Sequence, residues 1–188
     1  MRIISGERKG HKLKAPKGRE VRPTEDRIKE SLFNILSPIK IEAVVLDLFS
    51  GSGGIGIEFL SRGSKVAYFV DISSDSINVI TENLIHTKLR DKSIVLNRDA
   101  LSALNYFKGK DVKFDYIYLD PPFRNHKLLF QAIESISKSE LLSEDGIIII
   151  EHEKGLVLDN GINSFIRYDI RNYGSKFLSF YKNKEVYE

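Results

Sequence analysis

The segment Asp120-Pro121-Pro122-Phe123 directly follows the apolar run 116–119, and its residue types suit a transfer to a planar amine. Proline restricts its own φ and holds the residue before it in extended backbone, so Asp120 and the carbonyl of Pro121 are rigidly placed. If each accepts one N–H, the nitrogen lone pair turns towards an incoming methyl group. Phe123 offers a flat face for a base. We predict all four as catalytic residues, although Asp-Pro and Pro-Pro are also common turn signals.

A glycine-rich loop is the second motif. The apolar run 44–49 predicts a buried strand that leads into Gly51, Gly53 and Gly56, which match G-x-G-x-x-G. Glycines at this spacing permit a tight turn and bring backbone close to a ligand at a helix N-terminus. Asp71 follows the next predicted strand, where a carboxylate accepts hydrogen bonds from ribose hydroxyls. These features fit a nicotinamide dinucleotide and S-adenosylmethionine equally well.

Acidic residues at the ends of four successive predicted strands separate the two cofactors. Asp47 is placed to face the ammonium group of a methionine, Asp99 to accept from an adenine amino group, and Asp120 ends the fourth strand. A cationic sulfonium tolerates such a ring of carboxylates, whereas a pyrophosphate is repelled. Each acid alone also fits the cap of the following helix. The predicted cofactor contacts are Asp47, Phe49, Gly51, Ser52, Gly53, Gly56, Asp71, Ile72, Asp99 and Ala100.

Composition limits the class of protein. The 188 residues suit one domain, and 41% hydrophobic with 29% charged residues is typical of a soluble globular protein. The absence of cysteine excludes disulfides and thiolate chemistry. No apolar run approaches the ~18 residues that span a bilayer, and the basic N-terminus does not resemble a signal peptide. We expect a cytoplasmic protein.

Charge is concentrated at the N-terminus. Residues 1–22 hold eight Lys or Arg against two Glu, a net +6, and the remainder carries −3. We therefore predict a basic RNA-binding extension over 1–22, formed as a small β-hairpin from 3–5 and 12–14, before a catalytic domain over 23–188. A disordered basic tail is the alternative. The predicted RNA contacts are Arg2, Arg8, Lys9, Lys12, Lys14, Arg19, Arg22, Arg27 and Arg124.

The rest of the chain alternates between strand and helix patterns. A helix over 25–36, with Thr24 as N-cap, is stopped by Pro38. Strands are then predicted at 44–49, 66–70, 93–97, 115–119 and 146–151, with helices at 54–62, 75–86, 101–107 and 127–138 between them. This repeat predicts an α/β fold with a parallel sheet. A turn at 143–145 precedes the fifth strand, and 165–170 with 177–181 form an antiparallel hairpin at one sheet edge.

Together these motifs resemble the bacterial 16S ribosomal RNA guanine-N2 methyltransferases of the RsmD type. The matching stretches are 2–6, 22–27, 32–36, 48–53 with Gly56, Glu58, 61–63, 120–124, 173–174 and 178–181. The resemblance implies a Rossmann-like class I methyltransferase with a seven-stranded sheet and helices on both faces. It also implies S-adenosylmethionine as donor and a guanine of small-subunit RNA as acceptor. By the same resemblance, the glycine loop and Asp47 hold the methionine, Asp71 the ribose and Asp99 the adenine, while Asp120 and Pro121 hold the amine and Phe123 stacks on the base.

Three other functions stay open on the sequence: an NAD-dependent oxidoreductase, an N6-adenine methyltransferase for DNA or RNA, and a noncatalytic RNA-binding module. The four histidines show no metal-ligand spacing, so no metal is expected. Among them only His126 lies near the predicted site, and Arg124 is a candidate phosphate contact. We expect a monomer.

Overall fold

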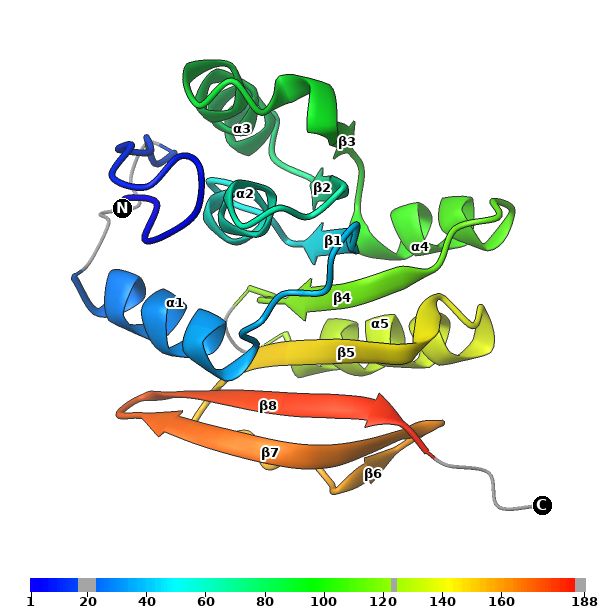
Figure 1. The fold of residues 1–188 in the computed structure, drawn as a ribbon. Coiled ribbons are helices and arrows are strands. Elements are labelled where there is room, and N and C mark those ends of the chain that lie inside the picture. Colours follow the sequence, from blue (N-terminus) through cyan, green and yellow to red (C-terminus); the bar gives the residue numbers. More distant parts are fainter. Residues whose placement is uncertain (17–22, 123–124, 185–188) are drawn as a thin grey trace.

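The computed structural model describes residues 1–16, 23–122 and 125–184. Its centre is an eight-stranded sheet with the strand order β3-β2-β1-β4-β5-β8-β7-β6 (Figure 1). The strands are β1 Val44–Leu48, β2 Val66–Asp71, β3 Ser93–Asn97, β4 Phe114–Leu119, β5 Leu142–Glu153, β6 Gly161–Ile162, β7 Phe165–Tyr173 and β8 Lys176–Asn183. The helices are α1 Pro23–Ile35, α2 Gly54–Ser61, α3 Ser74–His86, α4 Ala100–Lys108 and α5 His126–Lys138, with a 3₁₀ turn η1 at Arg90–Lys92. The predicted α/β class with a C-terminal antiparallel hairpin is confirmed.

Strands β1 to β5 are parallel to their neighbours, whereas β8 runs antiparallel to both β5 and β7. Strand order reverses between β1 and β4, because the chain first builds outwards to β3 and then returns to the other side of β1. Ligands of open α/β sheets bind at the carboxyl ends of the strands that flank such a reversal. The register pairs Leu48 with both Val70 and Leu119, so the residues after β1, β2 and β4 share one edge.

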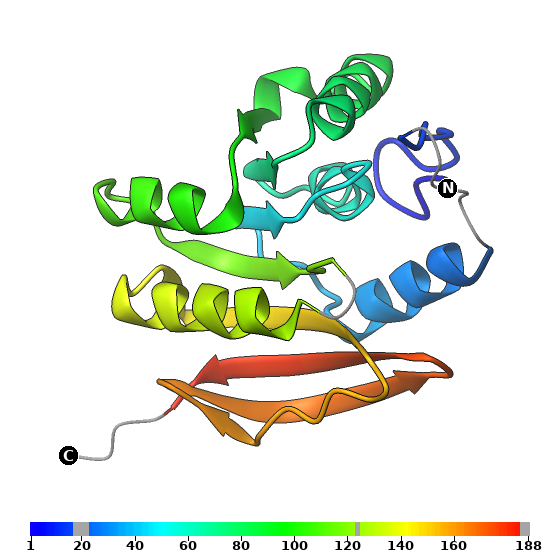
Figure 2. The same ribbon diagram turned by 180° about the vertical axis from the view of Figure 1, so that it is seen from behind.

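Helices cover both faces of the sheet. Side chains of α1, α2 and α3 belong to one buried cluster with one face of the sheet, and those of α4 and α5 to a second cluster with the other face. In Figure 2, α4 and α5 lie in front of the strands, and α1 lies behind them. All six residues of β4 are buried, because helices cover the sheet on both faces.

Helix α1 begins at Pro23, one residue earlier than the predicted cap. Thr24 therefore lies inside the helix, and its assignment as the N-cap is wrong. Proline suits the first helical position because its missing N–H has no partner there in any helix and its φ is already helical. The apolar face carries Ile28, Leu32 and Phe33, which are buried against the sheet.

The sheet has one strand more than predicted. The additional strand is β6, a two-residue segment that pairs with Ile166 and Phe165 of β7 and is too short to give a periodic pattern. The predicted turn at 143–145 is also wrong, because β5 already begins at Leu142, which pairs with Phe114. Ser143, Glu144 and Asp145 lie where the register shifts, so they form an irregularity within the strand and not a turn before it.

The N-terminal arm, residues 1–16, is folded onto the domain. It forms a hairpin-like loop held by one antiparallel bridge between Arg2 and Lys12 and by hydrogen bonds from Leu13 N to Met1 O (3.0 Å) and from Gly10 N to Ile3 O (2.9 Å). Full strands at 3–5 and 12–14 are absent from this described part of the chain. Ile3 and Leu13 are buried in the same cluster as α1, α2 and α3, so the arm is not a loose tail.

Candidate active site

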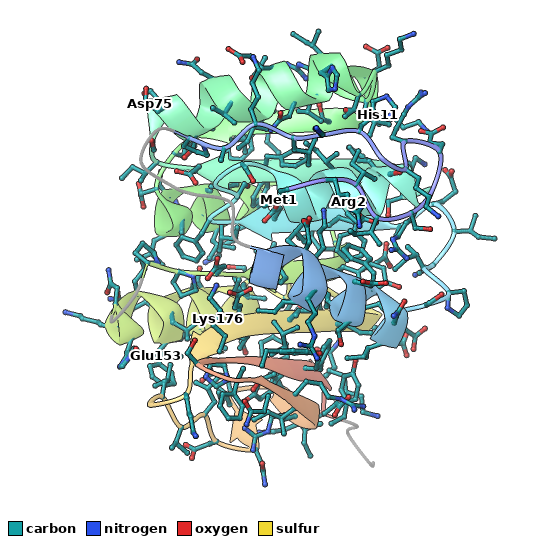
Figure 3. The ribbon with its side chains drawn as sticks, turned by 90° about the vertical axis from the view of Figure 1, so that its left-hand side faces the viewer. Met1, Arg2, His11, Asp75, Glu153 and Lys176 are labelled. Carbon is teal, nitrogen blue, oxygen red and sulfur yellow. The ribbon has the colours of Figure 1, made fainter. Side chains whose placement is uncertain are left out.

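A pocket of about 130 Å³ opens at the carboxyl ends of β1 and β4. Asp47, Phe49, Gly51 and Ser52 line it from the glycine loop, and Asp120 lines it from the end of β4. Asp120 is exposed and is not packed away under other side chains. Figure 3 views this edge of the sheet and places Met1 of the arm and Lys176 of β8 on opposite sides of the start of α1. The two motifs that the sequence predicted to act together therefore share one cavity.

The glycine loop turns through left-handed backbone at three of its residues. Phe49, Gly51 and Gly53 have φ angles of 71°, 56° and 76°. For a bulky residue such as Phe49 this conformation costs on the order of 1–3 kcal/mol, and it occurs mainly where function requires it. Ser50 holds the turn in place, since its hydroxyl donates to Asp47 O (2.5 Å) and accepts from Val70 N (2.9 Å). The loop is thereby fixed to β1 and β2.

Asp47 is a buried carboxylate at the floor of the pocket. Its Oδ2 accepts a hydrogen bond from Gly56 N (3.0 Å), and its side chain is only 2% exposed. Burial raises the pKa of Asp47 from 3.8 to about 7, opposed by the bond from Gly56 and assisted by the charge of Asp71. Gly56 has no room for a side chain, because a Cβ there would lie 2.4 Å from Cε1 of Phe69.

Asp71 at the end of β2 binds the glycine loop directly. Its Oδ2 accepts from Gly51 N (2.8 Å), and its Oδ1 accepts from Ser73 N (2.9 Å) just before α3. The neighbouring Ile72 is 73% exposed. Neither Asp71 nor Ile72 lines the pocket described above. Their predicted contact with the cofactor stays a prediction.

Asp99 caps helix α4. Its Oδ1 accepts from Ser102 N (2.9 Å), which is the helix-cap role that any aspartate in this position would serve. Ala100 is buried directly after it. Both residues follow β3, two strands away from the pocket and at the same sheet edge. The role of Asp99 towards an adenine likewise stays a prediction.

The arm and α1 form the wall of the pocket opposite the sheet, a contribution that sequence reasoning missed. Met1, Ala15 and Pro16 of the arm line it together with Ile28 and Lys29 of α1.

Asn83, which is 1% exposed on α3, fixes the arm to the glycine loop. Its side-chain nitrogen donates to both Lys14 O and Ser52 O (3.0 Å each), and its oxygen accepts from Lys14 N (2.8 Å). The local pattern around Asn83 gives no signal for contacts 31 and 69 residues away.

A buried charge cluster fastens the same arm to α1 and α2. Glu58 is 0% exposed and accepts from the backbone of Ile4 (2.8 Å) and Ser5 (3.0 Å) and from Arg62 Nε (2.9 Å). Lys29 Nζ lies 3.3 Å from the Glu58 carboxylate and donates to Arg2 O. Burial lowers the pKa of Lys29, and Glu58 opposes that effect. Glu58 is one of the residues of the family resemblance, whereas Lys29 has no sequence signal of its own.

A second, smaller cavity lies on the far side of Asp120. Pro121 and Pro122 line it together with Asn125, with His126 and Leu129 of α5, with Glu151, His152 and Glu153 of β5, with Leu156, and with Lys176 of β8. His126 Nε2 lies 2.7 Å from Glu153 Oε1.

Asp120, Glu151 and Lys176 border both cavities. Tyr118 donates a hydrogen bond to Glu151, and so does Lys176. Burial raises the pKa of Tyr118 well above its usual value, and the charges of Glu151, Asp120 and Asp47 add to this. Phe123 and Arg124 lie outside the described residues.

The predicted RNA contacts divide into exposed and half-buried residues. Arg2, Lys9, Lys12, Lys14 and Arg27 are exposed. Arg8 is half-buried, with its Nε buried and without a hydrogen bond in the described part of the chain. Arg19 and Arg22 fall outside the described residues, as does Arg124.

Residues 1–16, 23–122 and 125–184 contain no cluster of three or more His, Asp or Glu side chains that would hold a metal ion. No helix among them is long and apolar enough to cross a membrane.

An open sheet of this strand order, with a glycine loop after β1 and Asp-Pro-Pro after β4, defines a class I methyltransferase fold. The chain belongs to the family described as conserved hypothetical protein 95, whose sequence model matches residues 1–182. It is 38% identical over 98% of its length to the whole of YlbH from Bacillus subtilis, which is named provisionally as an rRNA methyltransferase. It is also 32% identical to ribosomal RNA small subunit methyltransferase D of Escherichia coli, over 86% of this chain and 77% of the relative. The resemblance predicted from the sequence is thus confirmed.

Solved structures agree with this assignment. The protein yhhF from Escherichia coli, described provisionally as a methyltransferase, superposes with a TM-score of 0.84 at 30% identity and 98% coverage of both chains. The Haemophilus influenzae protein HI0767, described provisionally as a methylase, gives a TM-score of 0.80 at 31% identity, again covering 98% of both chains.

Proposed function

We propose that the protein transfers a methyl group from S-adenosylmethionine to the exocyclic N2 amine of a guanine in 16S ribosomal RNA. The observation that carries this proposal is the position of Asp120. It lines the same pocket as the glycine loop and borders the second cavity, so an amine held by Asp120 lies between a site for the donor and a site for the base. The relatives named as small-subunit RNA methyltransferases supply the substrate class.

The pocket residues fit the methionine part of the cofactor. The amides at the start of α2 lie beside Gly51 and Ser52, and a helix N-terminus favours a carboxylate. Asp47 faces the same space and complements an ammonium group. S-adenosylmethionine, when bound, supplies an electrophilic methyl on a positively charged sulfur.

The adenosine side of the cofactor is assigned to the ends of β2 and β3. Asp71 and Asp99 each bond backbone amides, and carboxylate oxygens have further lone pairs for ribose hydroxyls and an adenine amine. The exposed side chain of Ile72 gives an apolar surface for the adenine ring, with Ala100 next to Asp99. The remaining predicted cofactor residues are Phe49, which lines the pocket, and Gly53 and Gly56 of the glycine loop.

The transfer itself is an in-line displacement. The N2 lone pair forms the new N–C bond while the C–S bond breaks. The electron pair of the broken C–S bond stays on sulfur, which becomes a neutral thioether. The nitrogen then loses one proton to Asp120 or to water. Asp120 and the carbonyl of Pro121 hold the two N–H groups of the amine. Phe123 stacks on the guanine after this base has left its neighbours in the RNA, and this contact offsets about 1–3 kcal/mol of the unstacking cost.

The RNA is assigned to the basic arm, since this segment carries exposed lysines and arginines and its two ends, at Met1 and Pro16, line the pocket. We assign the small subunit or an assembly intermediate as partner, a monomer as the active form, and the cytoplasm, where ribosomes are made, as the location.

The test is methyl transfer from labelled S-adenosylmethionine to small subunits from cells that lack this protein, followed by mass spectrometry of the nucleosides. N2-methylguanosine is the expected product. N6-methyladenosine would instead establish the adenine alternative, and the absence of any transfer would refute the proposal.

A further inference from the structure

The side chains of Tyr118, Glu151 and Lys176 form a polar cluster at the junction of the two cavities. Tyr118 and Lys176 donate to different oxygens of the Glu151 carboxylate. Glu151 is only 7% exposed, and the side chain of Lys176 is 25% exposed. Burying a carboxylate is costly unless its partners hold it, and these two donors fix its orientation.

The sheet places this carboxylate next to Asp120. Leu119 of β4 pairs with Ile150 of β5, so Asp120 and Glu151 are the next residues on two adjacent parallel strands, which lie about 4.8 Å apart. Both residues line both cavities. An amine that Asp120 holds therefore brings the adjoining atom of the same base ring close to Glu151.

The identity of that adjoining atom distinguishes the purines. In guanine the N2 amine stands next to N1–H, a donor, and N1 stands next to O6, an acceptor. In adenine the N6 amine stands next to N1, which only accepts. A carboxylate accepts and an ammonium donates, so Glu151 beside Lys176 matches the edge of guanine and opposes that of adenine.

The orientation of the base follows from burial. The sugar is attached on the N3 side of the purine and must lead out to the RNA chain. The N1 side therefore faces inwards, where Glu151 is nearly inaccessible to solvent.

We propose that Glu151 and Lys176 are the specificity-determining residues for the acceptor base. Glu151 accepts N1–H of guanine, Lys176 donates to O6, and Tyr118 is a positioning residue that orients the carboxylate. This inference rests on the proposed function and adds to it the residues that select guanine.

The experiment uses 2-aminopurine, which keeps the N2 amine but has an accepting N1 and no O6. A synthetic RNA segment with guanine or 2-aminopurine at the methylated position is ligated into the small-subunit RNA, which is then reconstituted into small subunits for the assay. The wild-type protein is expected to prefer guanine by about 100-fold or more in kcat/KM, because a site built to bond a donor rejects an analogue that lacks it. In Glu151→Gln, whose amide also donates, this preference falls by about tenfold or more.

Two further variants complete the design. Lys176→Met is expected to lower kcat/KM for guanine by about tenfold and to leave 2-aminopurine unchanged within about twofold, because only guanine has O6; this result stands if Glu151→Gln does not fold. Glu134→Gln is the matched control, a glutamate of α5 that pairs with Lys138 and lines neither cavity, and its preference should equal that of the wild type.

If Glu151→Gln and Lys176→Met each lowered kcat/KM equally for both RNAs, the inference would be overturned. The cluster would then have only a structural role in joining β5 to β8. A wild-type protein without preference between the two bases, or a loss of preference in Glu134→Gln, would also overturn the inference. Failure of the wild type to methylate guanine RNA at all refutes the proposed function instead, so the two failures are distinguishable.

Discussion

The two sides of the site are built from different kinds of contact. On the glycine-loop side, carboxylates bond backbone: Asp47 accepts from Gly56 N and Asp71 from Gly51 N. On the acceptor side, side chains bond side chains, as in Tyr118 with Glu151 and His126 with Glu153. Backbone contacts are independent of most substitutions, whereas side-chain pairs change with a single residue. The cofactor side is thus suited to a constant ligand, and the acceptor side to selection among bases.

Replacing Asp120 should give the largest effect on catalysis. Asp120→Ala removes the acceptor that holds the amine, and we expect kcat to fall by about 10²–10⁴-fold while the Kd for S-adenosylmethionine changes by less than about threefold. Single-turnover transfer and calorimetry measure the two quantities. An unchanged kcat, or a Kd that rises in proportion to the loss, would contradict the division between the two sides.

The buried cluster behind the cofactor side should show the largest effect on stability. Glu58→Gln leaves Lys29 buried without its counter-charge, and breaking such a pair costs about 3–5 kcal/mol. Hydrogen exchange at the amides of Ile4 and Ser5 should also speed up, since both donate to Glu58. The control is Glu82→Gln, an exposed partner of Lys14 whose loss costs less than about 1 kcal/mol. Equal losses in the two variants would show that the arm is not held by this cluster.

Gly56→Ala tests the close approach of α2 to β2. A Cβ at this position lies 2.4 Å from the ring of Phe69, so the substitution should cost about 1–3 kcal/mol in the free energy of unfolding and weaken cofactor binding. Gly155→Ala is the matched control, because nothing lies within 4 Å of a Cβ there. Combining Gly56→Ala with Phe69→Leu should recover part of the loss; thermal unfolding checks all three variants.

Asp47 predicts a pH dependence with a defined sign. Its pKa is about 7 in the folded protein, compared with 3.8 for an ordinary aspartate, so the folded state binds the proton more tightly. This group therefore lowers stability as pH rises from about 4 to about 7. Asp47→Asn should remove that fall and raise Tm at pH 8 relative to wild type, by about 2–4 °C for each kcal/mol recovered, while weakening cofactor binding. A parallel pH dependence of Tm in both proteins would contradict the assignment.

The smallest effect is expected at the arm surface. Lys9→Ala with Lys12→Ala should weaken RNA binding uniformly and make the slope of log K against log salt shallower by about 2, without changing cofactor affinity. Lys138→Ala on α5, whose lysine pairs with Glu134, is the control. An unchanged salt slope in the double variant would remove the arm from the RNA interface.

The sequence predicts this fold well where a local pattern exists. The alternation of apolar strands with helical segments, the glycine spacing and the Asp-Pro-Pro turn place β1 to β5 and their helices within a few residues. Prediction from the sequence fails where the contact that fixes a residue's position joins two residues far apart in the chain. Neither Asn83 to Ser52 nor Lys29 to Glu58 has a periodic signature, and β6 is too short to show one. The same reason explains why the Glu151 cluster, whose members come from three strands, is visible only in the folded chain.

The position of Tyr118 also gives the protein an internal optical reporter. The chain contains eight tyrosines and no tryptophan, so tyrosine emission is not masked by energy transfer to an indole. A phenol bonded to a carboxylate is a weak emitter, and Tyr118 is bonded to Glu151 at the boundary of both cavities. Occupation of either cavity that shifts this bond should therefore change the ultraviolet fluorescence of the unlabelled protein.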